Sequence, residues 1–384
     1  MAELPSYFKD FLARIRLTDD QVSELQDAHL TLRDRLEEDE NLSQIQVSDF
    51  LQGSYRRSTI VRPAEGKRVD VDVIAVTKLD RHSYTPQQAL EEFRSFLNTY
   101  YSGKWTFQGR SIGIALDTVD LDLVITSAPS EVAQRTLRSA SVKSAATLEE
   151  AYDLRFNEYW IPPELRESLT ARSMMFKAAG TPEWKLEPLW IPDRDAKEWQ
   201  QTHPLEQIRW TRDKNARTDG HFINVVKALK WWRRVQDPDA KHPKSYPLER
   251  IFGECCPDSI QSVATGVTET LEQIVSQFGI FAATGTVPTL CDHGLPDQNV
   301  LKRISGEEFG QFYESAKAAA VIAREALDEP EKPRSAKRWA DLFGEEFPLP
   351  PEGSDSSDGS KGGGVVGGYS DRGGPSTVGS GRFA

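Results

Sequence analysis

The sequence predicts an α+β protein: a mixed β-sheet packed with helices, then a mainly helical part, then a disordered tail. Short strands and amphipathic helices alternate up to about residue 126, without the Gly-x-Gly-x-x-Gly of a Rossmann domain or a Walker A sequence. Helical periodicity dominates from residue 220. After residue 351 the composition changes to Gly, Ser and Asp, which bury too little apolar surface to order a chain. We place the three parts at residues 1–160, 161–349 and 350–384.

Composition excludes several classes of protein. A chain of 384 residues with 38% hydrophobic residues is long enough for two folded domains. The net charge of −12 argues against a DNA-binding surface, which has to be basic. No apolar run approaches the roughly 20 residues of a membrane helix, and no signal peptide is visible. Three cysteines are too few for a disulfide framework. We therefore expect a cytoplasmic protein that uses neither DNA nor a membrane.

The N-terminal part begins with two helices and continues with five strands. Apolar residues at helical spacing predict helices within residues 6–40, the second beginning after Thr18. Thr85-Pro86 opens a further helix to about residue 100. We expect strands over residues 45–51, 69–76, 105–108, 111–116 and 117–126.

The later part is expected to be helical. Prolines interrupt the pattern between residues 130 and 215, where we expect loops and short helices. Beyond this segment, apolar periodicity predicts helices over residues 220–234, 247–255, 260–279, 305–327 and 336–343.

The stretch from residue 51 to residue 76 carries the chemistry. A Gly53-Ser54 turn precedes a strand with two aspartates, Asp70 and Asp72, between valines. Side chains alternate along a strand, so the two acids share one face, roughly 6–7 Å apart at the backbone, while the valines face a core. Two carboxylates so placed can hold a pair of divalent ions about 3.5–4 Å apart, the arrangement used for attack on phosphorus. Oxygen ligands suit magnesium.

A second strand also carries acids. Asp120 and Asp122 precede the apolar run Leu-Val-Ile. By itself, Asp-x-Asp is more often a pair of surface acids or part of a calcium loop, and Gly-Ser more often marks a plain loop. A glycine-serine turn followed by two acid-bearing strands is far more specific than either motif.

This arrangement resembles the polymerase-β-like nucleotidyltransferases, and within them the cGAS/DncV-like cyclic-oligonucleotide synthases. The resemblance implies that Gln52, Gly53 and Ser54 hold the donor triphosphate. It also implies that Asp70, Asp72 and Asp122 bind two Mg²⁺ ions, for which Mn²⁺ is a possible substitute. We choose Asp122 because the family's third acid precedes an apolar run; Asp120 is the alternative.

The resemblance continues in the helical part. Lys230 matches a helical lysine that contacts the donor triphosphate, although the same residue would also suit a solvated helix face. Ser245 and Tyr246 match a pair whose hydroxyl meets phosphate and whose ring stacks on a base; packing of the tyrosine beside Pro247 is the plainer alternative. The segment 292–299 resembles a family segment that we interpret as structural, with His293 in place of a proline.

Residues 1–349 resemble most the bacterial CD-NTases of the CdnD group, found in CBASS antiphage systems. This implies synthesis of a cyclic trinucleotide (or dinucleotide) from ATP and GTP by 3′-hydroxyl attack with release of pyrophosphate. It also implies partner proteins: a ubiquitin-activating-like enzyme that conjugates the carboxylate of Ala384, or a peptide-binding activator. A tail of no consequence is the plainer reading of the C-terminus. Two other functions stay open: a linear nucleotidyltransferase of the poly(A) or tRNA-end type, and a non-catalytic nucleotide-sensing module.

Overall fold

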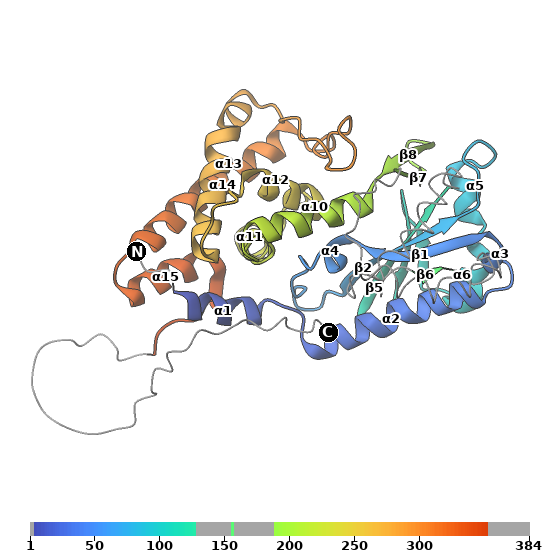
Figure 1. Cartoon of the computed structure of the whole chain (residues 1–384), viewed down its shortest axis with the longest axis horizontal. Helices are drawn as coiled ribbons and strands as arrows, with labels where there is room; N and C mark the ends of the chain where they lie inside the picture. Colours follow the sequence, from blue (N-terminus) through green and yellow to red (C-terminus); the bar gives the residue numbers. More distant parts are fainter. Residues whose placement is uncertain (1–3, 128–154, 157–187, 352–384) are drawn as a thin grey trace, which may run out of the picture.

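The computed structural model describes residues 4–127, 155–156 and 188–351 (Figure 1). Three predictions fall outside these residues: the division between residues 160 and 161, the disorder of the tail beyond residue 351, and the conjugation of Ala384. The proposed domain limits therefore stay predictions.

A mixed sheet forms one half of the molecule, as predicted, and contains a sixth strand beyond the five expected ones (Figure 1). Its strand order is β3-β4-β5-β2-β1-β6, with β2 and β5 parallel and the other neighbours antiparallel. The two central strands are the two acid-bearing segments. The strands are β1 (Gln46–Gln52), β2 (Val69–Thr77), β3 (Trp105–Phe107), β4 (Ile112–Ala115), β5 (Val119–Thr126) and β6 (Arg155–Phe156).

Helices cover one face of this sheet. α2 (Asp19–Glu38) runs along it, and α5 (Pro86–Glu91) and α6 (Arg94–Tyr100) pack beside α2. Capping boxes at Thr18 and Thr85 satisfy the first backbone N–H groups, which explains where α2 and α5 begin. The single helix predicted after Thr85 is divided in two, because the N–H of Phe93 bonds to the carbonyl of Leu90 in a tighter turn. The short helix α3 (Leu42–Ile45) leads into β1.

A helical layer forms the other half of the molecule (Figure 1). The predicted helices from residue 220 onward are all present, most with limits shifted by a few residues. The first helix of the chain joins this half: Phe8 and Phe11 of α1 pack against Trp339 and Phe343 of α15, with ring centroids 5.0 and 4.5 Å apart in the pairs Phe8–Trp339 and Phe11–Phe343. The helices are α1 (Pro5–Arg14), α11 (Phe222–Gln236), α12 (Ser245–Cys255), α13 (Val263–Thr284), α14 (Gly306–Asp328) and α15 (Lys332–Phe343), followed by a 3₁₀ turn, Gly344–Glu346.

The expectation of loops and short helices up to residue 215 is wrong for its described end. Residues 189–202 form a hairpin of β7 (Leu189–Asp193) and β8 (Glu198–Thr202), followed by the 14-residue helix α10 (Pro204–Arg217). The prolines misled the prediction. Pro204 stands in the first turn of α10, where its missing N–H has no helical partner to lose, so it begins a helix instead of breaking one.

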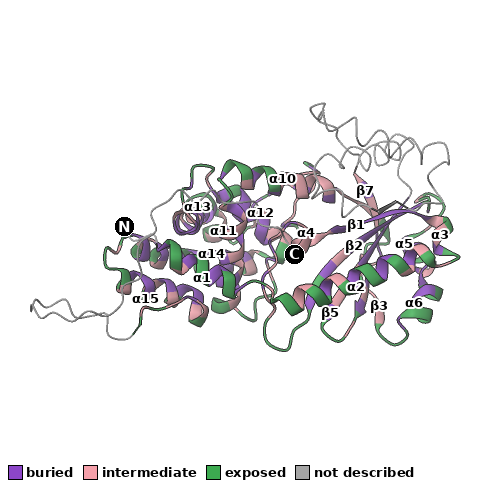
Figure 2. Cartoon of the chain, turned by 60° about the horizontal axis from the view of Figure 1, so that its bottom comes forward, coloured by how far each residue is buried: buried purple, intermediate pink, exposed green. Residues whose placement is uncertain are grey.

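The sheet face opposite α2 changes character along β2 and β5. Ile74, Val76 and Val124 are buried on this face beside Leu189 of β7. Toward the start of the same strands, acidic side chains replace the apolar ones. Figure 2 shows the corresponding loss of burial in β2 near the one-turn helix α4 (Gly53–Arg56). The acidic end therefore lies open between the sheet and the helical half. None of the described helices is long and apolar enough to cross a membrane.

Candidate active site

The parallel pairing of β2 and β5 brings the four predicted acids together. Asp70 is the register partner of Asp120, and Asp72 that of Asp122. The intervening valines of β2 are buried in the core beneath α2, as predicted. Because side chains alternate along each strand, all four carboxylates point to the face opposite α2. A pairing that the sequence could not specify thus places the second strand's acids beside the first strand's.

The carboxylates crowd one another. Burial, followed by the charges of Asp72 and Asp122, raises the pKa of Asp70 to about 7. Burial and the charge of Asp122 raise the pKa of Asp72 to about 6, against the opposing charge of Arg57. Burial also raises the pKa of Asp122, although the hydrogen bond from Gln108 lowers it. The cluster therefore holds more negative charge than its surroundings balance, and a bound cation would relieve this excess.

Asp120 and Asp122 differ in their surroundings. Asp120 is about half exposed, at 45%, and forms an ion pair with Arg68 at 3.2 Å. Asp122 forms no such ion pair with any arginine among the described residues: its Oδ1 accepts a hydrogen bond from Gln108 Nε2 at 3.0 Å. A carboxylate committed to a surface arginine is less available to an ion than one held by a neutral amide. This difference favours Asp122 as the third acid.

The donor set fits a hard divalent cation. The acids supply carboxylate oxygens, the ligands that Mg²⁺ prefers, and Mg²⁺ keeps waters and substrate phosphates as its remaining ligands. Among the described residues, no three His, Cys, Asp or Glu side chains converge closely enough to enclose an ion by themselves. The residues thus suit an ion shared with a substrate phosphate better than an ion held wholly by protein.

The Gly53-Ser54 turn is built directly against Asp72. Gln52, at the end of β1, is the register partner of Asp72, and Gly53 then begins α4 with a φ of +76°. A Cβ at Gly53 would overlap with Oδ2 of Asp72, so only glycine fits. From Gly53 the chain forms a single helical turn. It is closed by bonds from the N–H groups of Thr59 and residue 60 to the Ser54 carbonyl, at 2.9 and 3.1 Å.

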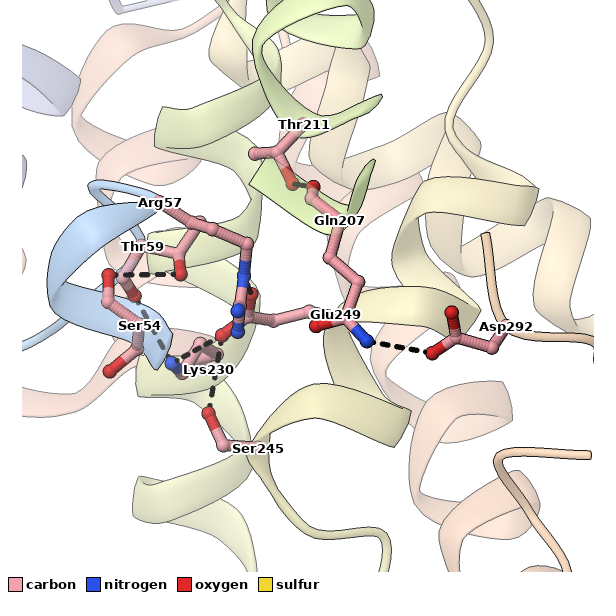
Figure 3. A network of polar contacts seen from close by, with 9 residues as sticks. All are labelled: Ser54, Arg57, Thr59, Gln207, Thr211, Lys230, Ser245, Glu249 and Asp292. Atoms are coloured by element: carbon pink, nitrogen blue, oxygen red, sulfur yellow. Dashed lines mark hydrogen bonds and ion pairs between the residues drawn. The ribbon is translucent and has the colours of Figure 1, made fainter. Parts of the chain in front are cut away.

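Lys230 and Ser245, both predicted as nucleotide-binding residues, meet at one carboxylate. Lys230 Nζ donates to Oε1 of Glu249 at 2.9 Å and to the carbonyl of Thr59 at 3.1 Å, and Ser245 Oγ donates to the same Oε1 at 3.2 Å (Figure 3). The Lys230 side chain is only 11% exposed. The solvated helix face considered for this lysine is therefore wrong.

Sequence reasoning missed Glu249 and Arg57. Arg57, which follows α4, donates from Nε to Oε2 of Glu249 at 3.1 Å. Burial alone would raise the pKa of Glu249, but the charges and hydrogen bonds of Arg57 and Lys230 outweigh it and lower the pKa to about 2. One signal was available: Glu249 stands four residues after Ser245, which is the spacing of one helix face, although the predicted helix began only at residue 247.

Tyr246 lies beneath Arg57, whose guanidinium carbon is 5.2 Å from the ring centroid. Burial raises the pKa of its hydroxyl, and the charge of Asp292 raises it further. Tyr246, Arg57 and His293 line a small cavity beside the site. The Tyr246 ring thus borders the cluster around Glu249, where a ring that stacks on the nucleotide base is expected.

The loop 292–299 is braced by α10 and by the residues that flank the loop, which supports its structural interpretation. Asp292 accepts a hydrogen bond from Gln207 at 2.8 Å, and Asn299 accepts the N–H groups of Leu290 and Leu301. His293 stacks on Trp210 with ring centroids 3.6 Å apart. Burial, then the nearby arginines, lowers the pKa of His293 to about 3, so this ring is neutral at physiological pH.

Known proteins resemble this chain in sequence and in fold. Residues 2–129 match the model of the Second Messenger Oligonucleotide or Dinucleotide Synthetase domain. The chain is 44% identical, over 93% of its length and 95% of theirs, to a probable cyclic AMP-AMP-GMP nucleotide synthase of Salmonella paratyphi B and to a cyclic AMP-AMP-GMP synthase of Enterobacter hormaechei. The fold is similar to the Vibrio cholerae cyclic AMP-GMP synthase DncV bound to a linear intermediate (TM-score 0.60, 14% identity, 90% of this chain and 96% of that one).

Fold and site together define a nucleotidyltransferase of the polymerase-β type, in which acids on paired strands face a glycine-serine turn. The sequence identity to the two synthases, over nearly the whole of both chains, identifies the family within this class. The chain belongs to the bacterial CD-NTases and is a cyclic-oligonucleotide synthase, as the resemblance implied. Its family uses divalent metal ions.

Proposed function

We propose that this enzyme joins ATP and GTP into a cyclic trinucleotide, as a CdnD-type synthase of a CBASS antiphage system. The observation that carries the proposal is the 44% identity, over nearly the whole of both chains, to two synthases named for cyclic AMP-AMP-GMP. The acid cluster supports the chemistry, because its excess negative charge suits ions that accompany a nucleotide triphosphate.

Asp70, Asp72 and Asp122 would hold two Mg²⁺ ions, with Mn²⁺ as a possible substitute. When bound, these ions supply charge neutralisation at the transferred phosphorus and the leaving pyrophosphate. The chain's own part is orientation. The amide of Gln108 donates to Oδ1 of Asp122 and so orients this carboxylate, which would accept the proton of the attacking 3′-hydroxyl.

The donor nucleotide would lie between the Gly53-Ser54 turn and the cluster at Glu249. An ammonium group has three N–H donors, and Lys230 uses two of them within the protein, which leaves one for a phosphate oxygen. Ser245 would exchange its bond to Glu249 for one to phosphate. The ring of Tyr246 would border the base.

A mass-spectrometric assay tests this proposal. The purified protein is incubated with the four ribonucleotides and Mg²⁺, and the reaction mixture is then treated with phosphatase. The masses of the products that survive are determined. We expect a phosphatase-resistant ring containing adenine and guanine, absent with Asp72→Asn and present with Asp120→Asn. Linear oligomers alone would favour a poly(A) or tRNA-end type of transferase. Nucleotide binding without any product, even with operon partners added, would favour a sensing module.

The partner proteins and location follow from the same proposal. A CBASS synthase works in the cytoplasm, with a ubiquitin-activating-like enzyme acting on Ala384 or with a peptide-binding activator. Mass spectrometry of the intact chain, isolated with and without such an enzyme in the same cells, would reveal an adduct on the terminal carboxylate. An unmodified chain in both preparations would contradict the conjugation.

A further inference from the structure

Glu249 is a buried carboxylate of α12 to which the chemistry above gives no part. Its side chain is 7% exposed, yet both of its oxygens are bonded to charged or hydroxyl groups. Oε1 accepts from Lys230 and Ser245, and Oε2 accepts from Arg57 (Figure 3). One carboxylate thus connects two residues expected at the donor triphosphate with a further cation.

The partners of Glu249 come from both halves of the molecule. Arg57 directly follows α4, which is built against the acid cluster, whereas Lys230 lies in α11 and Ser245 begins α12. Lys230 crosses the same boundary through its bond to the Thr59 carbonyl. Glu249 therefore links the segment that follows the glycine-serine turn to the helical side of the nucleotide site.

The charges and hydrogen bonds leave the cluster prepared for an anion. Two cations surround one carboxylate, so one positive charge remains unbalanced within the cluster. Lys230 keeps a third N–H, and Ser245 is held at Glu249 Oε1 by its single O–H. If Ser245 turns to a phosphate, Glu249 still keeps two charged partners and is not left unsatisfied.

We propose that Glu249 is the positioning residue of the donor-triphosphate site, and this rests on the proposed function. It holds the long Lys230 side chain in one conformation before ATP arrives, so binding does not have to order that side chain. Through Arg57, it holds the glycine-serine turn in the matching position. Glu249 acts on the nucleotide only through these partners and does not itself touch the nucleotide.

The simpler alternative is an ion pair that only joins the two halves. Buried ion pairs often stabilise a fold little more than apolar residues of the same volume. Such a pair would affect unfolding, but its effect on ATP binding would be the same whether or not Lys230 is present. Energetic coupling between Glu249 and Lys230 in ATP binding separates the two alternatives.

A double-mutant cycle measures that coupling. We would determine the Kd of a non-hydrolysable ATP analogue with Mg²⁺ for the wild type, Glu249→Gln, Lys230→Gln and the double variant. We expect each single change to weaken binding about tenfold or more, because it leaves a buried charged partner unpaired. The double variant should bind no more weakly than Lys230→Gln alone.

Asp49→Asn is the matched control. It breaks the equally buried ion pair with Arg33 on the α2 side of β1, where the two side chains are 3% and 1% exposed. We expect a lower Tm and an unchanged Kd. If Glu249→Gln does not fold, Glu249→Asp replaces it in the cycle. This change keeps the charge but withdraws the carboxylate, and the same coupling to Lys230 is expected.

Two results would overturn the role of Glu249 and leave the proposed function intact. One is additive losses of affinity in the cycle, and the other is a loss of affinity in Asp49→Asn as large as that in Glu249→Gln. A wild-type protein that does not bind the ATP analogue would instead overturn the proposed function, and this inference with it. The wild-type titration therefore distinguishes the two failures.

Discussion

The two sides of the nucleotide site treat their carboxylates in opposite ways. On the sheet, Asp70 and Asp72 crowd together with too few cations, and their pKa values rise to about 7 and 6. In the helical half, Glu249 is at least as buried, but Arg57 and Lys230 lower its pKa to about 2. The carboxylates of both sides are buried, but the main neighbours are other acids on the sheet side and cations on the helical side. The sheet side needs a ligand to balance it, whereas the helical side is already ordered.

The largest effect is expected on the unbalanced side. Asp72→Asn should lower the rate of product formation at least about 100-fold, because it removes a charge on which transition-state stabilisation depends. The fold should be unimpaired, because burial and the neighbouring carboxylates already disfavour the charge of Asp72 in the wild type. Circular dichroism and the rate measured by liquid chromatography check both statements. A variant that keeps the wild-type rate would remove Asp72 from the site.

The glycine-serine turn gives the next largest effect. Gly53→Ala should lower the rate roughly tenfold or more and cost about 1–2 kcal/mol of stability, since its φ is positive and the new Cβ overlaps with Asp72. Kinetics and urea unfolding measure the two. Gly66→Ala, at a positive φ with open space around the Cβ, is the matched control: it should lose stability but keep the rate.

The pH dependence of stability sharpens the comparison. Asp70 has a folded-state pKa of about 7, above its ordinary value, so its contribution to stability is present at low pH and is lost as the pH rises to about 7. The metal-free protein should therefore lose Tm between about pH 4 and pH 7, and Asp70→Asn should lose less. Saturating Mg²⁺ should raise the Tm at pH 8 back toward its value at low pH. A metal-free wild type and Asp70→Asn with parallel pH profiles would contradict this.

Gln108 should have a smaller effect. Its amide is held between Asp122 and Ser111, and Gly113 leaves room for it. Gln108→Ala should lower kcat several-fold, up to about tenfold, while the KM for ATP stays unchanged, because the amide orients one acid without binding the nucleotide. Steady-state kinetics decide the matter. A change in KM alone would place Gln108 at the nucleotide instead.

The smallest effect is expected at the surface pair of Arg68 and Asp120. Both side chains are almost half exposed, at 44% and 45%, so Arg68→Ala should change stability by less than about 1 kcal/mol. Activity should stay within a factor of two or three. A large loss of activity would indicate that Asp120, and not Asp122, is the third acid.

Local patterns predicted a large part of this molecule. The alternation of valine and aspartate in β2, the apolar spacing of the helices and the threonine caps each depend on neighbouring residues, so one sequence suffices to read them. Where a local signal had two meanings, the prediction failed. Pro204 was read as a helix breaker but begins α10, because proline at a first turn and proline in an interior look alike without the surrounding fold.

The sequence by itself determined the class of chemistry: a glycine-serine turn, acids on one face of a strand, and a lysine on a later helix. Tertiary structure decided which groups meet. The parallel pairing of β2 with β5 set Asp122 beside Asp72, and the packing of α12 against α4 and α11 placed Glu249 between Arg57 and Lys230. The contacts that join the two halves connect distant residues: Arg57 and Glu249 are 192 positions apart, and Thr59 and Lys230 are 171 positions apart. A single sequence carries no local signal for such pairs, because only the folded chain brings their charges together.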